Sequence, residues 1–169
     1  VDPEGSVTGA LFEEATENGY FAPQLMTALG KWGPPLDFSN PDAVTWWQEK
    51  LAVYQKMGIT GYKLDFAEEV IPGLFGARLP ALFHDGSDEF TMHRRYAILY
   101  HETYRPLIPE DGGFLLCRAG SYGDQVNGCI MWPGDIDATL AKHGEVRIDR
   151  EGKDYISVGG LPAAIVAGS

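Results

Sequence analysis

The chain has 169 residues, 44% of them hydrophobic and 12% aromatic, a composition typical of a globular domain with a real core. Thirteen lysines and arginines against 24 aspartates and glutamates give a formal net charge of -11, which argues against nucleic acid or an anionic membrane as a partner. No apolar run approaches the roughly 20 residues of a membrane span. Cys117 and Cys129 are too few for a disulfide scaffold, have no zinc-finger spacing, and are expected to be buried free thiols.

Two helices are expected in the first third of the chain. A short one is predicted within residues 10–19. A longer one begins at Asn40, a natural N-cap, with Pro41 in its first turn, and ends before Gly58. Its apolar stripe recurs at spacings of three and four: Val44, Trp47, Leu51 and Tyr54.

Strands and helices alternate in the middle of the chain. Residues 59–66 read as a strand, 67–86 as a long loop and 88–104 as a helix. The expected core positions of that helix are Phe90, Ala97, Tyr100 and Tyr104. Two further strands are expected at 114–118 and 128–132. This alternation predicts an α/β fold with a parallel sheet.

The predicted strands are too few for a closed barrel. A (β/α)8 barrel typically takes about 250 residues and eight strands, so residues 1–169 are interpreted as a single segment, an incomplete part of such a TIM barrel. The link from Arg118 to Gly128 is shorter than the usual parallel crossover, and some compact connection must serve there. A polar turn around 149–154 and a helix opening within 159–169 complete the expected order.

The first predicted strand ends in charge. Because side chains alternate along a strand, one apolar face should pack against helices: Tyr62, Leu64 and Phe66. Lys63 and Asp65 then point into the barrel, at the strand end where barrel enzymes keep their active sites. Lys63 should favour the ionised form of Asp65. An ordinary ion pair between adjacent strands explains this strand equally well.

The next two strand ends also carry candidate functional side chains. The second ends in Arg118, and the third in Trp132 followed by Asp135 and Asp137. An arginine at a strand end can simply form an ion pair, and a Pro-Gly turn followed by aspartate is common in ordinary loops, but three consecutive strand ends of this kind point to one site. Two carboxylates flanking a substrate, with aromatic and basic neighbours, are what glycosidic bond cleavage requires, one ionised and the other holding a proton.

These motifs resemble glycoside hydrolase family 31, the retaining α-glucosidases and α-xylosidases with a (β/α)8 catalytic domain. The most specific stretches are "LDFSNPDAVTWW", "KLDFAEE", "RAG" followed by "GDQ", and "WPGD", and they occur in this order over nearly the whole chain. Where the family often has glycine before the glutamate of the second motif, this chain has Ala67.

The resemblance implies roles for individual residues. Asp65 is similar to the family's catalytic nucleophile and Asp135 to its general acid/base. Four residues would line the sugar subsite beside the cleaved bond: Lys63, Arg118, Trp132 and Trp32. Glu68 would orient its loop, and His93 would be structural. The implied partner is an oligosaccharide or α-glycoside, bound with the remainder of the barrel, and no metal or organic cofactor is needed.

Two other readings stay open from the residues alone. In the first, the segment is a non-catalytic carbohydrate-binding or structural part of a barrel, with its carboxylates in ion pairs. A metal-dependent hydrolase is disfavoured, because no HExxH-type arrangement links the histidines at positions 84, 93, 101 and 143.

Overall fold

A computed structural model describes most of the chain, namely residues 9–23, 33–67, 70–71, 82–132, 146–148 and 154–156. Trp32, Glu68, Asp135, Asp137 and the predicted helix within 159–169 lie outside these residues. The elements in chain order are α1 (Gly9–Glu17), α2 (Pro41–Lys56), β1 (Gly61–Leu64), α3 (Glu89–Tyr104), η4 (Arg105–Leu107), β2 (Phe114–Cys117), η5 (Asp124–Asn127), β3 (Ile130–Met131), β4 (Val146–Ile148) and β5 (Asp154–Ile156).

Each of the two long helices begins with a side-chain cap, the first at the Asn40 cap that the sequence predicts and the second at the start of its predicted range. The side chain of Asn40 accepts a hydrogen bond from the backbone N–H of Asp42 at 3.0 Å, and Pro41 fills the first helical position. At the start of α3, Asp88 accepts from the backbone N–H of Thr91 at 2.9 Å. Each cap satisfies one of the backbone donors that a helix leaves unpaired at its beginning.

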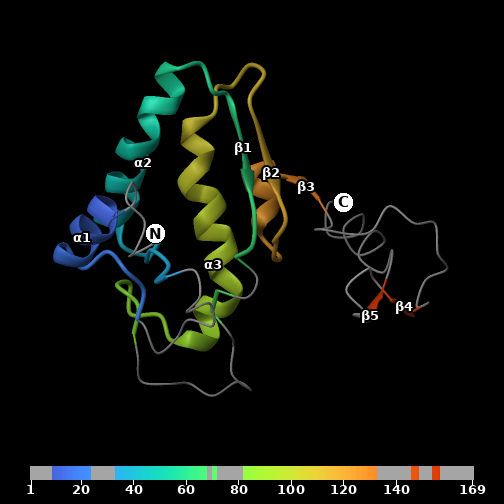
Figure 1. The fold of residues 1–169 in the computed structure, drawn as a ribbon, viewed down its shortest axis with the longest axis horizontal. Coiled ribbons are helices and arrows are strands. Elements are labelled where there is room, and N and C mark those ends of the chain that lie inside the picture. Colours follow the sequence, from blue (N-terminus) through green and yellow to red (C-terminus); the bar gives the residue numbers. More distant parts are fainter. Residues whose placement is uncertain are drawn as a thin grey trace.

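The first three strands form a parallel sheet in the order β1-β2-β3 (Figure 1). Leu64 of β1 is in register with Cys117 of β2, and Leu116 of β2 with Ile130 of β3. The helix α3 makes the crossover from β1 to β2, while the short 3-10 helix η5 makes the connection from β2 to β3. The predicted parallel α/β order is therefore confirmed, including the compact link after Arg118.

The helices cover one face of this sheet. Buried side chains from α2, β1, α3, η4 and β2 meet there in what we call the helix-side cluster: Leu51, Leu64, Tyr104, Leu107, Leu115 and Cys117. Tyr62 packs against it, with its ring 5.3 Å from that of Tyr104. The predicted outward orientation of Tyr62 and Leu64 is confirmed, and burying such side chains is the main contribution to holding β1 in place.

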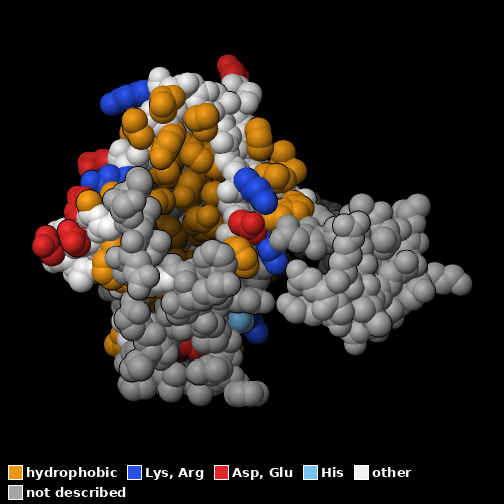
Figure 2. Space-filling view, in the orientation of Figure 1, with side chains coloured by type: hydrophobic (Ala, Val, Ile, Leu, Met, Phe, Trp, Pro, Cys, Tyr) orange, Lys and Arg blue, Asp and Glu red, His pale blue; other side chains and the backbone are white. Residues whose placement is uncertain are grey.

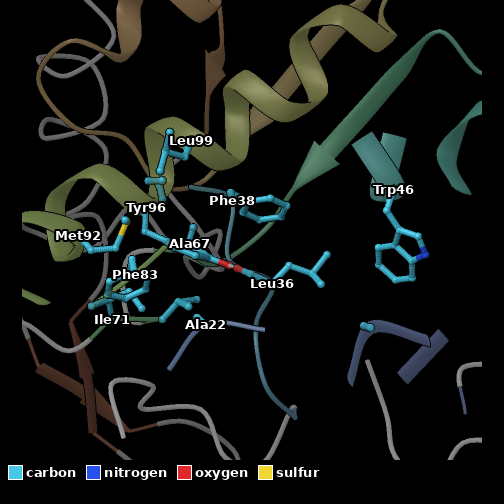
Figure 3. Packing of buried hydrophobic residues seen from close by; sticks show 14 residues of the cluster. Ala22, Leu36, Phe38, Trp46, Ala67, Ile71, Phe83, Met92, Tyr96 and Leu99 are labelled. Atoms are coloured by element: carbon cyan, nitrogen blue, oxygen red, sulfur yellow. Dashed lines mark hydrogen bonds between the residues drawn. The ribbon is translucent and has the colours of Figure 1, made fainter. Parts of the chain in front are cut away.

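A second, larger cluster lies beside α2 and α3 (Figure 3). It includes Leu36, Phe38, Trp46, Met92 and Tyr96, all less than a tenth exposed. The hydroxyl of Tyr96 donates to the backbone carbonyl of Leu36 at 2.9 Å, so this buried polar atom is satisfied. The cluster fixes the segment before α2 against α3.

Three predicted core residues are exposed instead. Tyr54 of α2 is 49% exposed, because α2 turns Trp46 into the core, where it lies 5.4 Å from the ring of Tyr20. Phe90 of α3 is 38% exposed, because α3 buries the arc that begins with Met92. Phe66 is 36% exposed: β1 ends at Leu64, so strand alternation no longer governs its direction.

Two short strands near the end of the chain were not indicated by the sequence pattern. β4 and β5 pair antiparallel, with Val146 opposite Ile156 and Ile148 opposite Asp154. They flank residues 149–153 of the predicted polar turn. Among the helices of the described part of the chain, none combines the length and apolar character required to cross a membrane.

Candidate active site

The backbone ladder of the sheet brings three side chains to one edge. The backbone N–H of Arg118 donates to the carbonyl of Leu64 at 3.0 Å, and that of Trp132 donates to the carbonyl of Cys117 at 2.9 Å. The strand ends are therefore level, and Asp65, Arg118 and Trp132 each follow directly on a strand. This is the carboxyl edge of a parallel sheet, where α/β enzymes place their sites.

Asp65 is the centre of the charged group at this edge. Its Oδ1 lies 3.3 Å from Nη1 of Arg118 and also accepts the backbone N–H of Phe66 at 2.9 Å. Its Oδ2 lies 3.5 Å from Nζ of Lys63. Both cations also face the ring of Trp132, with Lys63 Nζ 4.0 Å and Arg118 Cζ 5.8 Å from its centroid.

These contacts keep the carboxyl group of Asp65 ionised. Partial burial by itself would raise the pKa of Asp65. The hydrogen bonds from the Phe66 backbone and from Arg118, with the positive charges of Lys63 and Arg118, outweigh that effect and lower the pKa. The side chain remains 33% exposed, so the carboxylate is both charged and reachable by a ligand.

The turn after Asp65 has an unusual backbone. Phe66 and Ala67 have φ values of 60° and 86°, in the left-handed region that favours glycine. This geometry lets the Phe66 N–H fold back onto the Asp65 carboxylate, and it places the Phe66 ring 4.9 Å from the guanidinium carbon of Arg118. The backbone strain and the site are therefore adjacent.

A mostly apolar cavity of about 260 Å³ adjoins this turn. In Figure 2 it appears as a hollow over α3, between α2 and β1, with charged side chains along the β1 side. Its walls come from the segment before α2, from both long helices and from the end of β1: Pro34, Pro35, Leu36, Phe38, Trp47, Asp65, Phe66, Ala67, Val70, Tyr96, Tyr100 and Tyr104. Asp65 thus borders an aromatic hollow as well as a cationic pair.

The structure brings together the predicted site residues that it describes, which are Lys63, Asp65, Arg118 and Trp132. The predicted Trp32 and Asp135 lie outside the described residues. The ring of His93 donates from Nδ1 to the backbone carbonyl of Ile71, a contact that fits a structural part.

Sequence reasoning missed two features of the site. The Phe66 backbone N–H contributes more to the lowered pKa of Asp65 than Lys63 does. A residue pattern does not indicate such a backbone hydrogen bond. The aromatic hollow is assembled from segments far apart in the chain. Among the described residues, the single group of side chains with metal-ligand atoms in reach of one another is His101, Cys117 and Cys129, and it does not include Asp65.

Comparison with known proteins identifies the family to which the chain is similar. The sequence profile described as "Glycosyl hydrolases family 31 TIM-barrel domain" matches residues 1–147. An α-xylosidase of Emericella nidulans is 30% identical over 152 residues, covering 82% of this chain and 18% of that protein. A sulfoquinovosidase of Escherichia coli K12 is 29% identical over 136 residues, covering 74% of this chain and 19% of that protein. The chain thus spans less than a fifth of either relative.

Solved structures agree on the fold. A family 31 sulfoquinovosidase from E. rectale, in complex with an aza-sugar inhibitor, superposes with a TM-score of 0.57 at 24% identity, covering 75% of this chain and 20% of that one. A cycloalternan-forming enzyme from Listeria monocytogenes, in complex with a pentasaccharide substrate, gives 0.55 at 27% identity, covering 67% and 11%. The predicted partial (β/α)8 barrel is confirmed.

Proposed function

The chain belongs to glycosyl hydrolases family 31, and from this premise we propose that the protein carrying it cleaves α-linked glycosides with retention of configuration. The observation that carries the proposal is the Asp65 carboxylate, held ionised by Arg118 and Lys63 at the carboxyl edge of the sheet and one-third exposed. A nucleophilic carboxylate needs that combination of charge and access.

The proposed reaction has two steps. In the first, Asp65 attacks the anomeric carbon as the bond to the leaving oxygen breaks, and Asp135 gives that oxygen its proton. The product is a β-linked glycosyl ester on Asp65. In the second, Asp135 takes a proton from water, the water oxygen bonds to the anomeric carbon, and the ester bond breaks to restore the Asp65 carboxylate. Two inversions leave the released sugar in the α configuration.

The neighbours of Asp65 have proposed parts in binding. Arg118 and Lys63 offer hydrogen-bond donors on the same side as the carboxylate, where the hydroxyl groups of a sugar would lie. Trp132 offers an aromatic face beside them, and Trp32 is proposed as a second lining aromatic. The mechanism requires the carboxyl groups of Asp65 and Asp135 to be about 5–5.5 Å apart. We propose that the remainder of the barrel completes the pocket.

The experiment is a screen of the full-length protein against aryl α-glycosides of glucose, xylose, galactose and sulfoquinovose, with β-linked partners as controls. The last sugar is included because of the name of the E. coli relative. We expect turnover of at least one α-glycoside, with NMR detecting the α-anomer first. Release of the β-anomer first would contradict the double displacement.

A non-catalytic carbohydrate-binding protein is the competing reading, and binding data separate the two. An enzyme should bind a charged mimic of the oxocarbenium-like transition state at least about 10²-fold more tightly than the simple sugar. Equal affinities, together with no turnover of any glycoside, would favour the binding protein.

A further inference from the structure

A second group of reactive side chains lies on the helix-covered face of the sheet. His101 comes from α3, Cys117 ends β2, Cys129 precedes β3, and Asp124 opens η5. The side chain of His101 and the whole of Cys117 are fully buried, Asp124 is 6% exposed, and Cys129 is partly exposed. None of these residues takes part in the proposed glycoside chemistry. We infer that His101, Cys117 and Cys129 bind a thiophilic divalent cation such as Zn²⁺, with Asp124 orienting the imidazole.

The spacing of the donor atoms suits such an ion. A ring nitrogen of His101 and the two sulfur atoms all lie within 4.8 Å of one another. Zinc bonds of about 2.3 Å to sulfur and about 2.0–2.1 Å to nitrogen place tetrahedral ligand atoms about 3.5–3.8 Å apart. Shifts of about 1 Å in the positions of these three ligand atoms, made by side-chain rotation, would therefore form a zinc coordination sphere.

Asp124 supplies the second interaction that a metal-binding histidine usually has. Its Oδ2 accepts the proton on Nδ1 of His101 at 2.7 Å, and its Oδ1 accepts from Asn127 Nδ2 at 2.8 Å. With Nδ1 engaged, Nε2 is the nitrogen left to bind a cation. That Nε2 atom is buried and has no hydrogen-bond partner among the described residues. Carboxylate–histidine–metal arrangements fix the ring in this way.

The donor set favours zinc over calcium or magnesium. Two sulfur atoms and one imidazole nitrogen are soft or borderline ligands, whereas Ca²⁺ and Mg²⁺ prefer oxygen. Three protein ligands leave one position of a tetrahedron for water or another small ligand. The partial exposure of Cys129 provides the ion with a route from solvent.

The test uses the full-length protein, purified with reductant and stripped of metal by a chelator. Co²⁺ serves as the spectroscopic probe, and Zn²⁺ is then added as competitor. We expect one equivalent of Co²⁺ to produce a thiolate-to-metal charge-transfer band and visible d–d bands, both removed by Zn²⁺. The absence of any charge-transfer band in the native protein would overturn the site.

Three variants locate the ion. Cys129→Ser should lower the charge-transfer band of that equivalent, because Cys117 is then the one thiolate left of the pair, and should weaken Zn²⁺ binding at least about 100-fold. Asp124→Asn should keep the bands but weaken binding by about 10–100-fold. His84→Gln removes an exposed imidazole elsewhere and should change neither. Circular dichroism of each variant separates loss of binding from loss of fold.

Other results would also overturn the inference. A charge-transfer band of unchanged intensity in Cys129→Ser, or one that disappears in His84→Gln, would place the ion elsewhere. Mass spectrometry of the protein as isolated tests a disulfide, which would show a mass lacking the two thiol hydrogens and a Cys117–Cys129 cross-linked peptide. Finding that bond in the native protein would assign the pair to redox or structural chemistry instead.

Discussion

The two faces of the three-stranded sheet use the same strands for opposite purposes. On one face Lys63, Asp65 and Arg118 stay a quarter to a half exposed and surround a carboxylate with positive charge. On the other, Leu64 and Cys117 are almost completely buried against the helices. The residues alternate along β1 and β2, so one register determines both the site and the core. A one-residue slip would destroy both at once.

Each face also holds one acidic group whose pKa is lowered, by different means. The pKa of Asp65 is lowered by a backbone N–H, a guanidinium and an ammonium, against the opposing effect of partial burial. On the helix side, a hydrogen bond from the Cys117 thiol, with a further contribution from His101, lowers the pKa of Cys129 despite burial. The Asp65 carboxylate is open to a ligand, whereas the Cys129 thiol is only partly exposed and packs against the helix-side cluster.

The largest expected effect is on the open face. Asp65→Ala in the full-length protein should lower kcat by at least about 10⁴-fold, because the attacking carboxylate of the proposed first step is lost. Steady-state kinetics on the best aryl α-glycoside measures this. The matched control is Asp111→Ala, which removes an exposed carboxylate in the turn before β2 and should leave kcat unchanged. A near-normal kcat for Asp65→Ala would remove Asp65 from the mechanism.

Substitutions on the helix-covered face of the sheet should lower the stability of the fold. Leu64→Ala creates a cavity at a residue only 1% exposed, and should lower the free energy of unfolding by about 2–5 kcal/mol. Phe114→Ala, at a side chain 48% exposed on the neighbouring strand, is the control and should cost less than about 1 kcal/mol. Urea unfolding followed by tryptophan fluorescence compares them. Equal losses would contradict the assignment of faces.

Removing Arg118 should act through the charge of Asp65. The pKa of Asp65 is lowered, so its carboxylate stays ionised at lower pH than that of an ordinary aspartate. The acid-side fall of kcat/KM should therefore occur at low pH. Arg118→Met takes away one cause, so the acid limb should move to higher pH and kcat/KM at neutral pH should fall about 10²-fold. A pH profile that falls in height without moving would show that Arg118 only binds substrate.

The smallest expected effect concerns the strained turn. Ala67 has a φ of 86°, which glycine adopts without steric cost, so Ala67→Gly should raise the free energy of unfolding by about 1 kcal/mol. Ala97→Gly, in the regular helix α3, should instead lower it by about 1 kcal/mol. Destabilisation by both substitutions would show that the methyl group of Ala67 matters more than its backbone.

Capping signals and strand alternation predicted the features of the fold that depend on residues close together in the chain. Asn40 and Pro41 mark the start of α2, and alternation from Tyr62 to Leu64 orients β1, because capping and pleating depend on neighbours in the chain. Alternation failed at Phe66, where the strand has ended and φ is positive. Burial on α2 was misjudged at Tyr54 because it depends on how the helix packs against α3 and η4, which periodicity does not contain.

The candidate sites were predictable to different degrees. Lys63 lies one residue before the end of β1, and Asp65, Arg118 and Trp132 each follow directly on a parallel strand, so the sheet itself brings them together. His101 has no such signal: it joins the two cysteines through the crossover packing of α3, at spacings that match no metal motif. Contacts made by tertiary packing are the ones that residue spacing cannot reveal.

The claim that Asp65 is the nucleophile has one direct test. A 5-fluoro glycosyl fluoride of the preferred sugar slows release of the covalent intermediate, so the glycosyl ester accumulates on the full-length protein and can be located by peptide mass spectrometry. We expect the added sugar mass on the peptide that contains Asp65, and none after Asp65→Ala. A label on another carboxylate would contradict it.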